Sequence, residues 1–160
     1  MGRSRGGLTC KLHLAVDGCG RPLSILVTVG QRHESTQLEP LLDAIAVPRP
    51  GGIGRPRKRP LHLIADRGYA YTTCRALLRR RGIGHTIPER SDQQAARARR
   101  GSRGGRPPGF DRDRYRQRNV VERAFNRLKQ WRAVATRYDK RAANYRAGVV
   151  LASLVLWLAT

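Results

Sequence analysis

The chain has 160 residues, enough for one domain with a buried core. Its 33 Lys and Arg residues stand against 11 Asp and Glu residues, so the formal net charge is +22, and arginine is far commoner than lysine. Guanidinium groups stay charged and bind phosphate through paired hydrogen bonds, so we expect a polyanionic partner, with nucleic acid as the first candidate.

The same composition excludes several other classes of protein. Cys10, Cys19 and Cys74 are odd in number and widely spaced, and no CxxC or Cys/His zinc pattern occurs, so we expect reduced cysteines and no structural zinc. The N-terminus lacks an apolar signal region, and the apolar segment 147–159 is too short to span a bilayer. We expect a cytoplasmic protein without membrane contacts.

The first third of the chain predicts a β-hairpin followed by a helix. Residues 11–16 and 23–29 have the apolar content of strands, and the turn signal Asp17-Gly18-Cys19-Gly20 lies between them. A helix is predicted next, through Leu38 and its apolar neighbours. Residues 48–60 are rich in Pro, Gly and Arg and predict a loop.

A short buried strand over 61–65 ends at Asp66. In an open α/β sheet, ligands bind at the carboxyl ends of the strands, and Gly68 allows close approach of a ligand or backbone. The alternative is an ordinary strand-ending Asp in a turn. A basic helix over 72–81 and another short strand over 85–87 follow.

Residues 90–113 contain almost no large apolar side chains, and nine arginines fall between Arg97 and Arg118. This composition predicts a basic, flexible loop. Such a loop would either follow a DNA backbone through counterion release or serve as a solvated linker.

Four functional side chains recur at helical spacing in the segment YRQRNVVERAFNRLKQ: Tyr115, Arg118, Glu122 and Lys129. At about 100° per residue, they fall in a stripe about 60° wide on a single predicted helix. One carboxylate in line with two cations and a phenol can hold a divalent metal beside a phosphodiester. The alternative is an exposed helix on which Arg118 and Glu122 form an ion pair. The predicted buried face lies beside the stripe and comprises Val120, Val121, Ala124, Phe125, Leu128 and Trp131.

Asp66 and Glu122 together would suit a two-metal site for phosphoryl transfer. Carboxylate oxygens are the ligands that Mg²⁺ and Mn²⁺ prefer. Two such ions, about 4 Å apart, activate the attacking oxygen and stabilise the leaving one. Sites of this kind usually need three carboxylates, and the sequence offers two in a suitable context.

The chain resembles DDE transposases of the insertion-sequence four/five type over nearly its whole length. Their second-aspartate region is similar to LIADRGYAYTTCRALLRRRGIGHTIPER, and their third-acidic-residue region is similar to RNVVERAFNRLKQWRAVATRYDK. The Tyr-Arg-Glu-Lys signature is complete. Their hairpin and the turn after it are similar to KLHLAVDGCGRPL and VGQRHES.

This resemblance implies a ribonuclease-H-like fold, in which a mixed sheet is flanked by helices, and one partial catalytic domain over residues 1–160. It implies that Asp66 and Glu122 are the second and third catalytic acids and ligands of Mg²⁺ or Mn²⁺. Tyr115, Arg118 and Lys129 would contact the phosphates of the transposon end. The reaction would be hydrolytic nicking followed by attack of the freed 3′-hydroxyl on target DNA, in a synapse of two or more protomers.

The chain departs from the family pattern at its beginning. The family's first Asp lies on a central strand upstream of the hairpin, whereas MGRSRGGLTC contains no acid and Asp17 has the position of a turn residue. We therefore expect the chain to lack that strand, as the product of a downstream reading frame or a truncated copy. It would be inactive without an upstream segment that supplies the acid. The alternative is a non-catalytic fragment that binds transposon ends or inhibits the full-length transposase.

Overall fold

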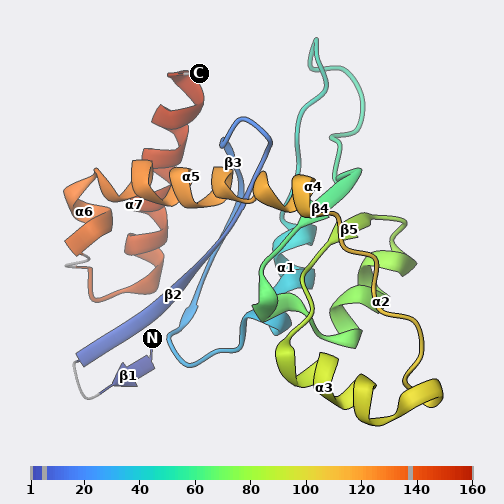
Figure 1. The fold of residues 1–160 in the computed structure, drawn as a ribbon. Helices are drawn as coiled ribbons and strands as arrows, with labels where there is room; N and C mark the ends of the chain where they lie inside the picture. Colours follow the sequence, from blue (N-terminus) through green and yellow to red (C-terminus); the bar gives the residue numbers. More distant parts are fainter. Residues whose placement is uncertain (1, 5–6, 137–138, 160) are drawn as a thin grey trace. The chain divides into compact units, whose positions relative to one another are not determined.

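The computed structural model describes residues 2–4, 7–136 and 139–159. Contacts between residues divide the chain into two compact units (Figure 1). The first unit consists of Met1–Arg59 and Asn119–Thr160, and the second of Pro60–Arg118. Each unit combines helices with a small sheet, so the α/β part of the predicted fold class is confirmed.

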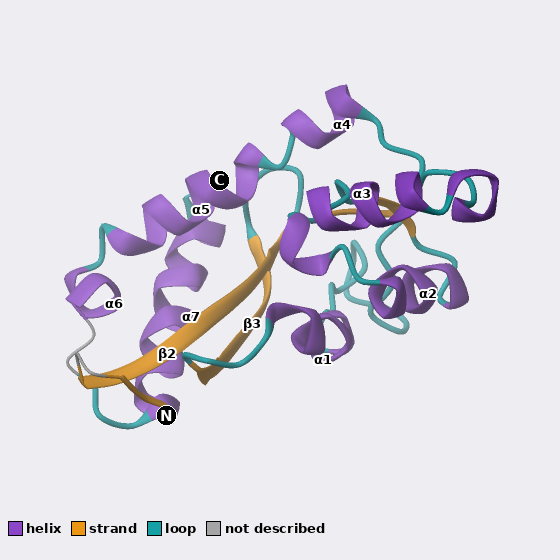
Figure 2. Cartoon of the chain, turned by 60° about the horizontal axis from the view of Figure 1, so that its bottom comes forward, coloured by secondary structure: helices purple, strands orange, loops and turns teal. Residues whose placement is uncertain are grey.

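A three-stranded antiparallel sheet forms the centre of the first unit. Strands β1 (Gly2–Ser4), β2 (Gly7–Val16) and β3 (Pro22–Val29) lie in the order β1-β2-β3. The β2–β3 pair is the predicted hairpin, with Leu14 opposite Ile25. The two long strands run side by side in Figure 2.

The turn of this hairpin is built around the Asp17 carboxylate. Its Oδ1 accepts hydrogen bonds from the backbone N–H groups of Cys19 and Arg21, both at 2.9 Å. Its Oδ2 accepts from the Arg21 guanidinium at 2.7 Å. Gly20 closes the turn with a φ of 86°, a conformation that favours glycine. Both oxygens of Asp17 therefore hold the turn, as the sequence predicts.

Helices complete the first unit. A short 3₁₀ segment, η1 (Glu34–Gln37), leads into α1 (Leu38–Asp43). After the second unit, the chain returns as α5 (Asn119–Lys129), α6 (Arg132–Thr136) and α7 (Ala142–Leu158). None of the described helices has the length and apolar character needed to cross a membrane.

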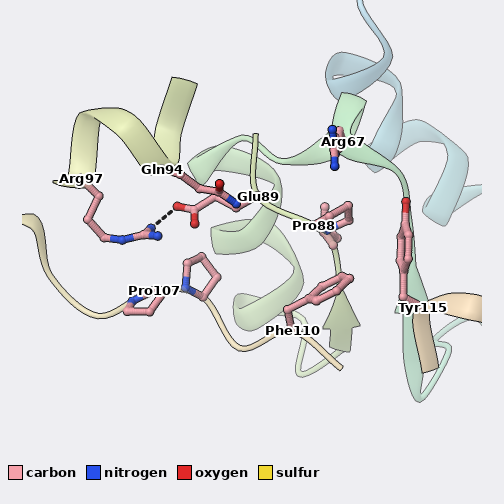
Figure 3. A pocket seen from close by; sticks show the side chains of 10 residues that line it. Arg67, Pro88, Glu89, Gln94, Arg97, Pro107, Phe110 and Tyr115 are labelled. Atoms are coloured by element: carbon pink, nitrogen blue, oxygen red, sulfur yellow. Dashed lines mark hydrogen bonds and ion pairs between the residues drawn. The ribbon is translucent and has the colours of Figure 1, made fainter. Parts of the chain in front are cut away.

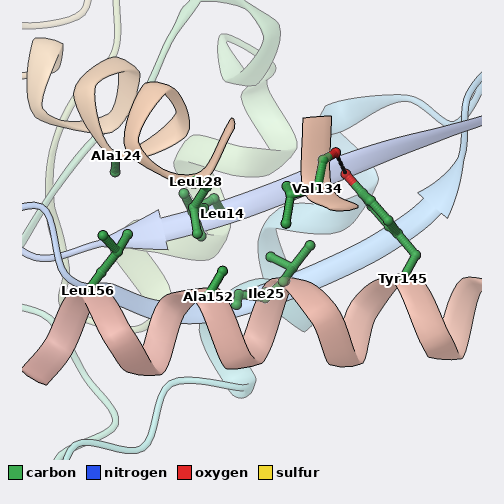
Figure 4. Packing of buried hydrophobic residues seen from close by; sticks show 9 residues of the cluster. Leu14, Ile25, Ala124, Leu128, Val134, Tyr145, Ala152 and Leu156 are labelled. Carbon is green, nitrogen blue, oxygen red and sulfur yellow. Dashed lines mark hydrogen bonds between the residues drawn. The ribbon is translucent and has the colours of Figure 1, made fainter. Parts of the chain in front are cut away.

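The hydrophobic core of the first unit lies between the hairpin and helices α5 and α7 (Figure 4). Polar atoms at its edge are bonded: the Tyr145 hydroxyl donates to the Val134 carbonyl at 3.3 Å, and Trp157 Nε1 donates to the Pro22 carbonyl at 2.7 Å. One face of α7 faces this core, whereas its opposite face is exposed. The core residues are Leu14, Ile25, Ala124, Leu128, Val134, Tyr145, Val149, Ala152 and Leu156.

The second unit is built on two parallel strands joined by a helix. Strand β4 (His62–Ile64) pairs with β5 (Gly84–Thr86), and α2 (Thr72–Arg80) connects them, because parallel neighbours need a crossover. A single 3₁₀ turn, η2 (Arg67–Tyr69), precedes α2. The positions of these elements match the predicted strands and helix, but β4 is half-buried and Leu61 is exposed, so the prediction of a buried strand is wrong. Its buried side chains include Ala70, Cys74, Leu78, Ile83 and Ile87.

The segment predicted as a basic loop over residues 90–113 is largely helical. It contains α3 (Ser91–Arg99), the 3₁₀ helix η3 (Gly101–Gly104) and the beginning of α4 (Arg112–Arg116). The loop prediction rested on the lack of large apolar side chains. However, Ala, Gln and Arg are strong helix formers, and a helix this polar needs only polar contacts to stay in place.

Leu128 is expected to be essential to the stability of the first unit. Its side chain is completely buried between α5 and the hairpin, so Leu128→Ala leaves a cavity and should lower the free energy of unfolding by about 2–5 kcal/mol. The matched control is Leu151→Ala on the exposed face of α7, which should change it by less than about 0.5 kcal/mol. Urea unfolding followed by circular dichroism measures both. Equal effects of the two substitutions would contradict this packing.

Candidate active-site residues

Asp66 lies just beyond the carboxyl end of β4, at the edge of the parallel pair. The backbone of Ala65 still bonds to Thr86 of the neighbouring segment, and Asp66 then begins η2 as its N-cap. Its Oδ1 accepts a hydrogen bond from the Gly68 N–H at 2.8 Å. The residue is exposed, and a carboxylate has about four acceptor sites, so this bond orients the side chain and leaves capacity for another ligand.

A cleft of about 370 Å³ lies in the second unit and includes Arg67, the neighbour of Asp66 (Figure 3). One part of its wall is charged: the Arg97 guanidinium forms an ion pair with Glu89. Another part is aromatic, where Phe110 and Tyr115 have ring centroids 5.2 Å apart. The lining residues are Arg67, Ile87, Pro88, Glu89, Gln94, Arg97, Pro107, Pro108, Phe110 and Tyr115.

Tyr115 and Arg118 lie together at the end of the second unit. The Arg118 guanidinium lies 5.6 Å from the centre of the Tyr115 ring, within the range of a cation–π contact. The backbone N–H of Arg118 also bonds to the Tyr115 carbonyl at 2.9 Å. The phenol and the guanidinium therefore lie beside each other, and the phenol borders the cleft.

The expectation of one continuous helix from Tyr115 to Lys129 is wrong. Helix α4 ends at Arg116, and α5 begins at Asn119. Between them the backbone makes i to i+3 bonds, such as Gln117 N–H to the Arg114 carbonyl at 3.1 Å, in place of the i to i+4 bonds of an α-helix. Because of this break, the spacing of residues in a single α-helix does not place Tyr115 and Arg118 on the same face as Glu122 and Lys129.

Glu122 and Lys129 belong to α5, in the first unit. They are seven residues apart, which is about two turns, so they share one face of the helix. Both are exposed, whereas Ala124 and Leu128 on another face are buried in the core. Glu122 lies in the first helical turn, where the helix dipole favours a carboxylate.

The candidate metal ligands therefore come from both units, Asp66 from the second and Glu122 from the first. Among the residues that the structure describes, no group of three or more His, Cys, Asp and Glu side chains is arranged to hold a metal ion. Both candidate carboxylates are exposed, and oxygen donors of this type suit Mg²⁺ or Mn²⁺.

A histidine that the sequence does not single out as functional connects three elements beside the cleft. His62 on β4 contacts Thr86 Oγ1 through Nε2 at 3.0 Å and Arg114 Nη1 through Nδ1 at 3.1 Å. Arginine can only donate, so Nδ1 accepts and the proton resides on Nε2, which donates to Thr86. Burial lowers the pKa of His62, and the Arg114 cation lowers it further. His62 thus ties β4 to β5 and to α4, the helix that carries Tyr115.

Comparisons with known proteins give the class of this chain. Residues 2–157 match the family described as "Transposase DDE domain". The chain is 35% identical over 156 residues to the "Putative transposase for insertion sequence element IS402" of Burkholderia cepacia, an alignment that covers 97% of this chain and 65% of the relative. It is 30% identical over 155 residues to the "Putative transposase for insertion sequence element IS6501" of Brucella ovis, covering 94% of this chain and 99% of the relative. No solved structure gives a significant match.

These matches define a protein of the transposase class. The chain belongs to the DDE transposase family, because the family match extends over almost all of it. It spans 65% of the length of the IS402 relative, and it spans nearly all of the IS6501 relative.

The contact between His62 and Arg114 should make stability depend on pH. Because the pKa of His62 is lower in the folded protein than its usual value of about 6.5, the unfolded chain binds more protons in the range between the two values. The free energy of unfolding should therefore fall as pH decreases below about 6.5, and His62→Gln should remove part of this loss. Urea unfolding between about pH 7.5 and about pH 5 measures it. His13 should account for part of the pH dependence that remains in His62→Gln, because burial also lowers the pKa of His13. An unchanged pH dependence in His62→Gln would contradict this role.

Proposed function

We propose that the chain is the greater part of the catalytic domain of a DDE transposase of the insertion-sequence four/five type, with a ribonuclease-H-like fold. It would cleave DNA strands at insertion-sequence ends and join the freed ends to target DNA. The observation that carries the proposal is the position of Asp66. In a chain that matches the family over residues 2–157, this exposed carboxylate follows a parallel strand at the sheet edge where ligands bind.

Asp66 and Glu122 would be the residues of this chain that hold Mg²⁺ or Mn²⁺. The Gly68 N–H fixes the Asp66 side chain, and the packing of α5 fixes the rotation of the helix that carries Glu122. When bound, the metal supplies activation of the attacking oxygen and stabilisation of the leaving oxygen. Both steps would be in-line displacements at phosphorus, first by water and then by the freed 3′-hydroxyl, so no covalent enzyme intermediate is required.

Tyr115, Arg118 and Lys129 would hold the phosphates of the transposon end. The guanidinium of Arg118 can donate two parallel hydrogen bonds to one phosphate, and its stacking on Tyr115 restricts its orientation. Lys129 adds a positive charge on the same face of α5 as Glu122. These three side chains would position the scissile strand, and the +22 charge of the chain would attract DNA from solution.

The first carboxylate would come from a segment upstream of the hairpin. Asp17 is a poor candidate, because both of its oxygens are bonded within the hairpin turn. Along residues 10–16, β2 pairs with β3 on one side, and no other described strand pairs with it there. An added strand could bond to this edge and carry the missing acid.

Further partners follow from the same proposal. Transposon ends and target DNA would be the substrates, and two or more protomers would form the synapse in the nucleoid of a bacterial cytoplasm. A non-catalytic fragment that binds transposon ends or inhibits the full-length transposase is the competing function. Strand cleavage distinguishes these two functions. Both predict that the chain binds DNA, but only the transposase predicts that it cleaves a strand.

Cleavage should require both proposed acids and an upstream segment. The chain alone should leave a duplex that carries the ends of its own element intact in Mg²⁺, whereas the chain extended by the upstream sequence should nick it. In the extended protein, Asp66→Asn or Glu122→Gln should reduce nicking by about 10²-fold or more and leave end binding within about twofold. Denaturing gel electrophoresis measures nicking, and fluorescence anisotropy measures binding.

Two results would contradict the proposal. Undiminished nicking by either variant would show that the carboxylate is not part of the site. Failure of every extended protein to nick, together with normal binding of the ends, would favour the non-catalytic fragment.

A further inference from the structure

Four exposed arginines gather on the helical segment that follows the charged wall of the cleft. They lie at the end of α3, in η3 and just beyond it, and together they are named the α3–η3 basic surface: Arg99, Arg100, Arg103 and Arg106. The acids of the same unit are engaged elsewhere. Glu89, Asp92, Asp111 and Asp113 form ion pairs with other arginines, and Asp66 caps η2.

The segment that carries this surface is fixed to the rest of the second unit. Gln93 in the first turn of α3 donates through Nε2 to the Ala70 carbonyl at 3.0 Å, and its Oε1 accepts from the Arg90 N–H at 3.3 Å. One turn further, the ion pair between Arg97 and Glu89 ties the helix to the segment after β5 (Figure 3). Polar contacts to two separate segments, at Ala70 and at residues 89–90, therefore hold a helix without large apolar side chains in one position.

Glycines hold the following turn against the same helix. A Cβ atom on Gly104 would lie 2.3 Å from the carbonyl oxygen of Arg97. The backbone of η3 therefore approaches α3 more closely at this position than a residue other than glycine would permit. Gly101 and Gly105, on either side, have φ values of 55° and 73°. Arg103 lies between these glycines, and Arg100 and Arg106 flank them directly. The tight turn presents these arginines on an ordered backbone, which reduces the entropy lost when they bind a ligand.

We propose that the α3–η3 basic surface binds the sugar–phosphate backbone of duplex DNA without reading its sequence. The second unit has 15 arginines against 5 acids, so a polyanion is the fitting partner. Residues 91–106 contain no aromatic side chain on which the bases of a single strand could stack. Their only apolar side chains are alanines, which gives no apolar face for insertion into a lipid surface.

This surface would add a contact with DNA that takes no part in the proposed strand cleavage. Tyr115, Arg118 and Lys129 are proposed to grip the strand being cut, whereas the α3–η3 basic surface would hold any duplex, such as target DNA or the DNA flanking an end. The inference rests on the proposed function only in that the chain handles DNA. Binding without metal tests the surface alone, so loss of cleavage and loss of duplex binding can be distinguished.

The test compares two variants of the full chain that each lose four exposed cations. The first carries Arg99→Gln, Arg100→Gln, Arg103→Gln and Arg106→Gln. The control carries Arg55→Gln, Arg57→Gln, Lys58→Gln and Arg59→Gln in the exposed loop of the first unit. Fluorescence anisotropy with a short mixed-sequence duplex, in EDTA and over a series of salt concentrations, gives the slope of log K against log salt. Circular dichroism checks that each variant is folded.

The first variant should lower the magnitude of the salt slope by about 3 to 4, because each lost phosphate contact removes about 0.9, and the control should change it by less than about 1. Gly104→Ala, which keeps every charge but displaces η3, should also weaken binding of the duplex. Equal losses in the two quadruple variants would show that overall charge is responsible and would overturn the proposal. An unchanged slope in the first variant, or a loss confined to double-stranded RNA or to anionic vesicles, would overturn it as well.

Discussion

The packing of α5 is the constraint on which the candidate site depends. Ala124 and Leu128 are buried against the hairpin and α7, and this burial fixes the rotation of the helix about its axis. Once the rotation is fixed, helical geometry leaves Glu122 and Lys129 on an exposed face. The hydrophobic effect, which has no direction of its own, thus determines where a charged pair is presented. A loss of packing at Leu128 would therefore change the position of Glu122, although Glu122 itself would be unchanged.

The second unit orients its functional groups by polar contacts instead. The Gly68 N–H orients Asp66, Arg118 stacks on Tyr115, and His62 connects the strands to α4 through Arg114. Such bonds are directional, and each contributes only about 1 kcal/mol to stability. They suit the proposed role of the unit, which is to present cations to a phosphate backbone, since large apolar side chains would not serve that surface. The high arginine content therefore serves the structure and the proposed binding of DNA together.

The sequence predicts the elements whose signals are local. The hairpin, α2 and strand β4 follow from apolar runs bounded by turn residues, and the strand-end position of Asp66 follows from the same signals. The break after Arg116 is not predictable in this way, because neighbouring Gln, Arg and Asn give no breaker signal. Helix α3 is missed because it has no large apolar side chains to give a hydrophobic pattern, and the bond that holds it to the unit runs from Gln93 to the Ala70 carbonyl, 23 residues away. The contact between His62 and Arg114 joins residues that are 52 positions apart in the sequence, and no periodic pattern in the sequence indicates it.

The proposed active site requires Asp66 and Glu122 to hold the same metal ion. Iron(II) bound in place of Mg²⁺ reduces added hydrogen peroxide to hydroxyl radicals, which cut the polypeptide beside the metal ligands, and mass spectrometry locates the cuts. We expect cuts near both Asp66 and Glu122, and excess Mg²⁺ should suppress them. Asp66→Asn or Glu122→Gln alone should remove both sets of cuts. If each substitution removed only the cuts near its own position, or neither set changed, the two carboxylates would not share a metal.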